Sequence, residues 1–337
     1  EAKSRGLEAA LYGDGVRFGG CLRFDRGGQA AGMGISCRSV GAISQCGGLR
    51  DRDLAQTDTR KLRNNRRQLN HTEGNTMRAA SKQFLVDLLS APGPSGYEGP
   101  VRSVWKAEVE GFADRVNVDV HGNAIGIYNG TGSPRIMFAG HMDELGFQII
   151  YIDERGYLYF DNMGGFDMQI VPGRKVHIHT AKGKVLGVLG KKPIHLMQPA
   201  DRRKVPDKHD LWIDIGVADG DEAKKMVAIG DPVTYEPNFE DLRNGLAVSR
   251  GFDNKAGAWV VAEALRRVSK AKKKCKASVY AVATVQEEIG LRGAKTSTYG
   301  VDPLVGIAVD VTWAMDHPSV DKRQVGECKL GGGPVIT

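Results

Sequence analysis

Residues 135–144 read Arg-Ile-Met-Phe-Ala-Gly-His-Met-Asp-Glu, an apolar run that ends in one histidine and two acids. Two later stretches of the 337-residue chain have the same form. The run at 277–285 is followed by Gln-Glu-Glu, and the run at 303–309 is followed by Asp310. Apolar runs of this length favour buried strands. Because strand ends in an open α/β sheet are where distant side chains converge on a ligand, these stretches predict an α/β fold with one site at the strand ends.

The histidine and the acid after the first run have a spacing that suits metal binding. Residues i and i+2 of a strand lie on the same face, so His141 and Asp143 are expected to share one. A metal-bound imidazole usually offers its second nitrogen to a carboxylate, which fixes the tautomer. Taken alone, such a pair is more often an ordinary surface pair, so the metal hypothesis depends on the other acids.

Four further acids could complete such a site. Asp253 directly precedes a helix expected over residues 254–268, where an aspartate can cap the helix and bind a metal at the same time. Glu287 and Glu288 directly follow the expected buried strand as an adjacent pair. In an ordinary loop, two adjacent acids at this position would lower stability, because their charges repel and lose hydration. Since adjacent side chains diverge, we expect one to bind metal and the other to lie over the bound water. Asp310 would supply another ligand.

Changes of pattern divide the chain into three parts. Residues 1–76 combine frequent glycine (13 of 76) with no sustained apolar period, which predicts a disordered leader outside the working protein. Residues 77–145 and 247–337 carry the α/β pattern and are expected to form one catalytic domain. Residues 146–246 change to short alternating strands between glycine turns, which predicts a small β-barrel inserted into that domain.

The net charge of +7 does not argue for a polyanionic partner. Residues 1–76 hold 13 Lys or Arg and 8 Asp or Glu, whereas the rest of the chain holds 34 and 32, so we expect no nucleic-acid partner. No run of 18 apolar residues exists, and no membrane span is expected. Only Cys275 and Cys328 lie beyond residue 76, which favours a reducing compartment and a cytoplasmic location.

Other catalytic signatures are absent from the sequence. It contains no G-x-S-x-G, no H-E-x-x-H and no G-x-x-x-x-G-K-[ST]. Five histidines of the expected barrel and of polar loops are weak ligand candidates: His177, His179, His195, His209 and His317.

The motifs together resemble those of metallopeptidase family forty-two, the group of the glutamyl and tetrahedral aminopeptidases, some of whose members carry endoglucanase or cellulase labels. The resemblance covers roughly residues 80–337. Its most specific stretches are Ala-Gly-His-Met-Asp-Glu-Leu-Gly at 139–146, Phe-Asp-Asn-Lys-Ala-Gly at 252–257, Val-Gln-Glu-Glu-Ile-Gly at 285–290, Val-Asp at 309–310 and Leu-Gly-Gly-Gly-Pro at 330–334.

The resemblance implies a zinc-peptidase-like catalytic domain built on a mixed sheet, with two divalent metal ions, zinc or cobalt, as cofactors. His141 and Asp310 would bind one ion. Asp253 would bridge the two ions, and Glu288 would bind the second. The family places one more histidine ligand several dozen residues beyond the last acid. No histidine follows His317, so we expect C-terminal truncation at Thr337.

The same resemblance implies the reaction and the partners. Glu287 would act as general base on a metal-bridged water that attacks the first peptide bond of a peptide substrate. Asp143 would orient His141. The inserted barrel would serve as the oligomerisation domain of a homo-oligomer, which is a dodecamer in the family, or else as a lid over the active site.

Three rival hypotheses stay open. A dinuclear-metal deacylase of N-acyl amino acids would use the same ligands. A glycosidase needs two carboxylates about 5–9.5 Å apart across the sugar, which the adjacent Glu287 and Glu288 fit badly. The third rival is a non-catalytic, truncated homologue.

Overall fold

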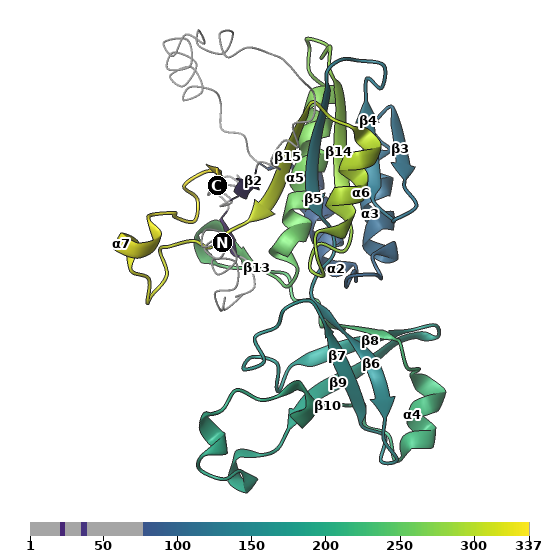
Figure 1. Ribbon diagram of the computed structural model, residues 1–337, viewed down its shortest axis with the longest axis vertical. Helices are drawn as coiled ribbons and strands as arrows, with labels where there is room; N and C mark the ends of the chain where they lie inside the picture. Colours follow the sequence, from purple (N-terminus) through teal and green to yellow (C-terminus); the bar gives the residue numbers. More distant parts are fainter. Residues whose placement is uncertain (1–20, 24–34, 39–76, 337) are drawn as a thin grey trace, which may run out of the picture.

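The computed structural model describes residues 21–23, 35–38 and 77–336. The leader expected over residues 1–76 therefore lies outside the described residues, except for two short strands, β1 (Cys21–Arg23) and β2 (Ile35–Arg38). The described part has a mixed sheet with helices, which we call the sheet domain, and a β-barrel that lies below it in Figure 1. The expected α/β architecture with an inserted barrel is confirmed.

The sheet domain is built on seven strands in the order β16-β2-β15-β5-β14-β4-β3. Three neighbours at its centre are parallel, because β5 pairs in parallel with both β14 and β15. Thr284 of β14 lies opposite His141 of β5, so their carboxyl ends meet at the same edge. The bounds are β3 (Arg115–Val118), β4 (Ala124–Tyr128), β5 (Arg135–His141), β14 (Ser278–Thr284), β15 (Val305–Val311) and β16 (Val335–Ile336).

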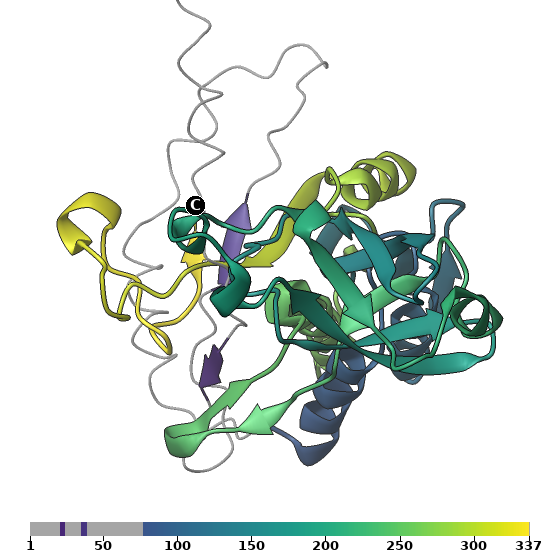
Figure 2. The ribbon, with the colours of Figure 1, turned by 90° about the horizontal axis from the view of Figure 1, so that it is seen from below.

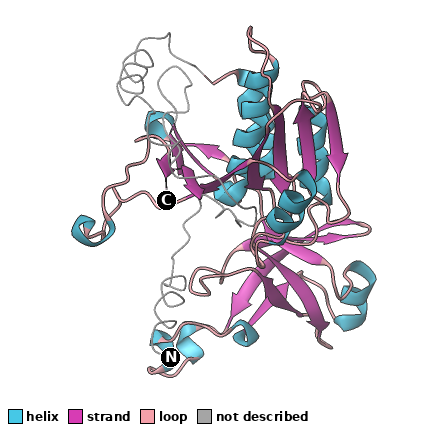
Figure 3. Cartoon of the chain, turned by 45° about the horizontal axis from the view of Figure 1, so that its top comes forward, coloured by secondary structure: helices cyan, strands magenta, loops and turns pink. Residues whose placement is uncertain are grey.

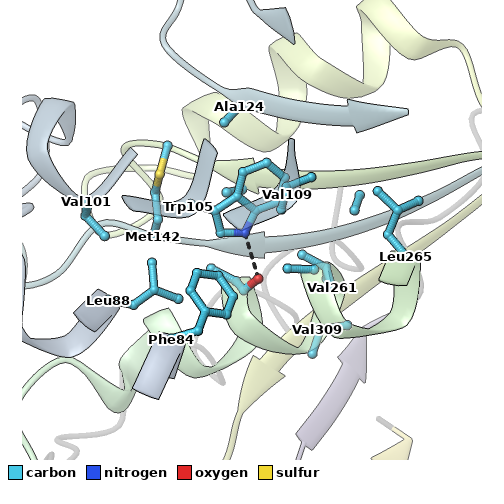
Figure 4. Close-up of a cluster of buried hydrophobic side chains, with 14 of the residues drawn as sticks. Phe84, Leu88, Val101, Trp105, Val109, Ala124, Met142, Val261, Leu265 and Val309 are labelled. Atoms are coloured by element: carbon cyan, nitrogen blue, oxygen red, sulfur yellow. Dashed lines mark hydrogen bonds between the residues drawn. The ribbon is translucent and has the colours of Figure 1, made fainter. Parts of the chain in front are cut away.

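Helices cover both faces of this sheet (Figure 3). On one face lie α2 (Ala79–Ser90), α3 (Gly99–Val109) and α5 (Phe252–Ser269), and on the other lies α6 (Arg292–Val301). Alternate residues of β14 point to opposite faces of the sheet. Ala281 belongs to the hydrophobic cluster between the sheet and α5, and Val282 packs with Val301 of α6 on the other face. Trp105 belongs to the same cluster as Ala281, and its Nε1 donates to the carbonyl oxygen of Ala258 at 2.9 Å (Figure 4).

The barrel closes with the strand order β10-β7-β6-β11-β8-β9. Alternation decides which side chains fill it: Val176 and Ile178 are buried in its core, whereas His177 between them is only partly buried. The short helix α4 (Gly220–Met226), which the sequence analysis did not predict, lies beside the barrel (Figure 2). The strands are β6 (Gly146–Ile152), β7 (Leu158–Met163), β8 (Lys175–Thr180), β9 (Gly183–Lys191), β10 (Leu211–Asp214) and β11 (Pro232–Tyr235).

Shorter elements join the two parts. Strands β12 (Glu240–Asp241) and β13 (Leu246–Val248) form a small sheet with β1 and lead from the barrel into α5. The helix α7 (Lys322–Val325) follows β15.

Among the described helices, none has both the length and the apolar character needed to cross a bilayer. Cys275 and Cys328 are free thiols, and the compartment expected from them stays a prediction.

Candidate metal centre

The carboxyl ends of β5 and β14 carry most of the candidate site. His141 is the last residue of β5, and Glu287 and Glu288 follow β14 after a two-residue turn. Asp310 lies near the end of β15, and Asp253 lies at the start of α5. Because β5 leads directly into the barrel, this edge faces the junction between the two parts of the molecule (Figure 1).

The structure brings these side chains together around the His141 ring. Its Nε2 lies 3.2 Å from Oδ1 of Asp253, 3.6 Å from Oε2 of Glu287 and 3.8 Å from Oδ1 of Asp310. Within the described residues, two groups have ligand atoms that all lie within 4.8 Å of one another. They are His141 with Asp253 and Asp310, and His141 with Glu287 and Glu288.

The donor set fits divalent cations. One imidazole and four carboxylates converge where the carboxylates are partly open to solvent and the imidazole is buried. Imidazole and carboxylate together suit zinc, cobalt and similar transition metals, and carboxylates crowded this closely repel one another unless cations lie between them. The histidines that the sequence analysis treated as weak candidates, such as His177 and His179, belong to neither group of the described residues.

Asp143 is a buried residue whose carboxylate contacts several residues of the site. Its Oδ1 lies 3.3 Å from Nδ1 of His141, the nitrogen that faces away from the carboxylate cluster. Its two carboxylate oxygens also accept hydrogen bonds from the backbone N–H groups of Glu287 at 3.0 Å and Glu288 at 3.2 Å. A fourth partner is Ser95, whose hydroxyl donates at 2.6 Å. The backbone carbonyl oxygen of Asp143 also lies 3.1 Å from Nδ1 of His141, so this residue fixes the imidazole and the two glutamates relative to one another.

Ser95 is a residue that the sequence analysis missed. It lies in the loop between α2 and α3, where Pro92 to Gly96 predicted only the end of a helix. A hydroxyl in a glycine- and proline-rich loop carries no local signal of a contact with a residue 48 positions away. Only the packing of this loop against the end of β5 shows the contact.

Burial and neighbouring charges shift the pKa values of three residues in the site. Burial lowers the pKa of His141, but hydrogen bonds with Asp143 and Asp253 outweigh it and hold the pKa well above its usual range. Burial raises the pKa of Asp143, and the hydrogen bond with His141 reverses this, so the pKa is lowered. Burial raises the pKa of Glu287; the charge on His141 opposes the rise, and nearby Asp310 adds to it. These shifts describe a site with an excess of negative charge around one imidazole.

The start of α5 differs from the expected arrangement, in which Asp253 was a candidate for both helix cap and ligand. Asp253 and Asn254 have non-helical backbone angles, and the cap is Asn254, whose Oδ1 accepts from the N–H of Gly257 at 2.9 Å. The Nδ2 of Asn254 donates to the carbonyl of Val309 at 2.8 Å, next to Asp310. With the cap supplied by its neighbour, the Asp253 carboxylate is turned toward His141.

Two glycines let α5 come close enough to the sheet for this contact. A Cβ on Gly140 of β5 would lie 2.4 Å from the carbonyl carbon of Gly257 in α5. A Cβ on Gly257 would lie 2.6 Å from the carbonyl oxygen of Val309 in β15. Any larger residue at either position would push the helix off the strands and carry Asp253 away from His141.

Comparisons with known proteins point to one family. A family model described as M42 glutamyl aminopeptidase matches residues 122–337. The lysyl aminopeptidase of Pyrococcus furiosus is 35% identical over 257 residues, which cover 75% of this chain and 72% of that protein.

Solved structures are similar over the same region. The TET aminopeptidase of a marine sediment archaeon of the Thaumarchaeota has a TM-score of 0.70 at 39% identity, covering 72% of this chain and 68% of that one. The Pyrococcus horikoshii TET1 peptidase, described as able to assemble into a tetrahedron or a large octahedral shell, has a TM-score of 0.63 at 35% identity and covers 68% of each chain.

Proposed function

Because this chain belongs to the M42 glutamyl aminopeptidase family, we propose that it is a metal-dependent aminopeptidase that removes N-terminal residues from peptides. The observation that carries the proposal is the convergence of His141, Asp253 and Asp310 at the edge of the sheet. These residues come from three elements far apart in the sequence, and their ligand atoms lie within 4.8 Å of one another.

Two ions would be held by different parts of this cluster. His141 and Asp310 would bind one ion and Glu288 the other, with Asp253 bridging both; zinc or cobalt suits such donors. Asp143 would hold the ligand nitrogen of His141 toward the ions through its contact with Nδ1. When bound, the ions would supply Lewis acidity and lower the pKa of a water molecule.

Glu287 is the residue proposed to move the proton. Its carboxylate oxygen Oε2 lies 3.6 Å from the ligand nitrogen of His141, at the partly exposed side of the cluster, and its backbone is fixed by Asp143. It would accept a proton from the attacking water as the oxygen adds to the peptide carbonyl. It would then deliver that proton to the leaving amine as the C–N bond breaks.

A comparison of substrate classes tests this proposal. We expect the metal-loaded protein to cleave a tripeptide with a free amino terminus at least about 100-fold faster than its N-acetylated form, since a site built to bind an amino group rejects substrates that lack it. A metal chelator should stop the reaction. Faster release of acetate from the blocked form would favour the deacylase, and chelator-resistant hydrolysis of cellulose would favour the glycosidase. Inactivity toward every substrate would favour the non-catalytic homologue.

We also propose that the protein is a homo-oligomer that assembles through its barrel. TET1, the Pyrococcus horikoshii peptidase with a similar fold, can assemble into a tetrahedron or a large octahedral shell. The barrel exposes apolar side chains that a second copy could cover, among them Tyr151 at 54% and Ile229 at 67% exposure. Light scattering of the purified protein should give a mass several times that of one chain. A single-chain mass would overturn the proposal.

A further inference from the structure

A buried ionic cluster lies next to the candidate metal centre without contributing to either group of ligands. Its centre is Glu144, which accepts from Nζ of Lys255 at 2.8 Å and from the backbone N–H of Gly93 at 3.0 Å, and which forms an ion pair with Arg250. Lys255 also donates to the carbonyl of Ala91 at 2.6 Å. The Lys255 side chain has no exposed surface and that of Glu144 is 4% exposed, so neither can meet a peptide substrate.

The cluster joins three segments that position the ligand residues. Glu144 follows Asp143 and lies three residues beyond His141, and Lys255 lies two residues beyond Asp253. Their hydrogen bond therefore links the segment after β5 to the start of α5 by a short path. The bonds from Lys255 to Ala91 and from Gly93 to Glu144 tie the α2–α3 loop into the same cluster.

The packing around this link leaves it little freedom. Gly251 has a φ of +72°, and a Cβ there would lie 3.0 Å from Oε2 of Glu144 and 3.6 Å from Nζ of Lys255. A glycine is thus needed where the backbone turns past the ion pair into α5. A shift of α5 along or away from β5 would have to break the bond between Lys255 and Glu144.

Stability alone is a poor explanation for this arrangement. Two cations and one carboxylate are buried together, and buried ion pairs of this kind often contribute no more stability than apolar side chains of the same volume. The Nε and Nη2 atoms of Arg250 also have no hydrogen-bond partner among the described residues. What the cluster does provide is a directional link between the two segments that carry His141 and Asp253.

We propose that Lys255 and Glu144 are positioning residues for the metal centre, and that their bond sets the distance between the Asp253 carboxylate and the His141 imidazole. The inference rests on the metal-dependent function proposed above. It assigns these residues no contact with substrate and no part in proton transfer. Their effect is on how tightly the preformed ligand set holds its ions.

The variant that tests this is Lys255→Met, which keeps an unbranched chain and removes the donor. It leaves Glu144 and Arg250 as a pair of equal and opposite charges, so the cluster does not gain an unpaired carboxylate. We expect the affinity for Co²⁺, measured by titration of the metal-free protein, to fall about 10- to 100-fold, the range seen when residues that orient metal ligands are lost. The visible absorption of bound Co²⁺ should change as well, because it reports ligand geometry.

Trp259→Phe provides a matched control on the same helix. It removes another hydrogen bond from an α5 side chain to a backbone carbonyl, the 2.9 Å bond from Nε1 to the oxygen of Ser81, but lies away from the ligands. We expect both variants to lower the melting temperature. Trp259→Phe, unlike Lys255→Met, should leave the Co²⁺ affinity and the Co²⁺ spectrum unchanged. Equal loss of affinity in both variants would show a general stability effect and overturn the positioning role.

Two further outcomes are decisive. Wild-type affinity and spectrum in Lys255→Met would overturn the positioning role while leaving the metal centre intact. Failure of the unaltered protein to bind Co²⁺ would overturn the metal centre, and the positioning role with it. If Lys255→Met does not fold, Lys255→Gln replaces it, since the shorter neutral amide cannot span both Ala91 and Glu144, and the same loss of affinity is expected.

Discussion

The Glu287→Gln variant is expected to lose about 10²- to 10⁴-fold in kcat while it binds metal as the unaltered protein does. Glutamine has the shape of glutamate, and the hydrogen bond from the residue 287 backbone to Asp143 does not involve the changed side chain. The amide cannot accept the proton of the attacking water or return it to the leaving amine. Steady-state kinetics on a free-amino-terminus peptide, with metal content per chain measured on the same sample, checks both halves of this expectation.

The adjacent residue supplies the control. Glu288→Gln makes the same chemical change one position along, in a side chain proposed to bind an ion instead of a proton. There we expect metal content to fall together with activity, and added metal to restore part of the rate. The base role of Glu287 would be lost if Glu287→Gln kept more than about a tenth of the wild-type kcat, or if the two variants behaved alike.

The strand ends could be predicted because each is marked in the sequence by its own composition. The runs before His141, Glu287 and Asp310 are apolar and rich in small or β-branched residues, and all three form strands of one sheet. That β5 lies between β14 and β15, parallel to both, follows from pairing across more than a hundred residues and has no local signature. The grouping of the three ends was therefore a hypothesis about topology, and the structure places them at one edge.

Contacts that depend on packing could not be predicted. The bond from Ser95 to Asp143 and the bond from Lys255 to Glu144 each join segments that approach only when the α2–α3 loop and α5 close over the end of β5. A buried lysine has the same local sequence signal as an exposed one. The close approach of α5 to the sheet at Gly140 and Gly257 likewise depends on how the helix packs on the strands, so the sequence alone does not predict it.

One missed element did carry a local signal. Helix α4 begins with Asp219-Gly-Asp-Glu222, in which the Asp219 side chain accepts from the N–H of Glu222 at 2.8 Å and Glu222 accepts from the N–H of Ala218 at 2.8 Å. An N-cap acid followed three residues later by a glutamate is similar to a capping box, except that Glu222 accepts from the N–H of Ala218, one residue before the N-cap, and not from that of Asp219. The helix has only seven residues, too few for a sustained helical period of apolar residues.

The second large effect is expected for Asp143→Asn, with a loss of at least about 100-fold in kcat/KM and about 1–3 kcal/mol in the free energy of unfolding. Each carboxylate oxygen of Asp143 accepts one backbone N–H, from Glu287 at Oδ1 and from Glu288 at Oδ2. An asparagine has only one oxygen, so in either orientation its NH₂ group would face one of these donors. Because the acceptor is fully buried, the N–H group opposite the NH₂ loses its partner at position 143, and either the glutamates or the His141 ring must shift.

Ser95→Ala separates this effect from the simple loss of a hydrogen bond. It removes one donor to Asp143 but leaves both backbone donors and the contact with His141 in place. We expect less than a tenfold loss of kcat/KM and nearly normal metal content, whereas Asp143→Asn should lower both, because it displaces ligand and base together. Kinetics, metal content and urea unfolding of the two variants provide the comparison. If Asp143→Asn were no more damaging than Ser95→Ala, Asp143 would not be the residue that holds His141, Glu287 and Glu288 in register.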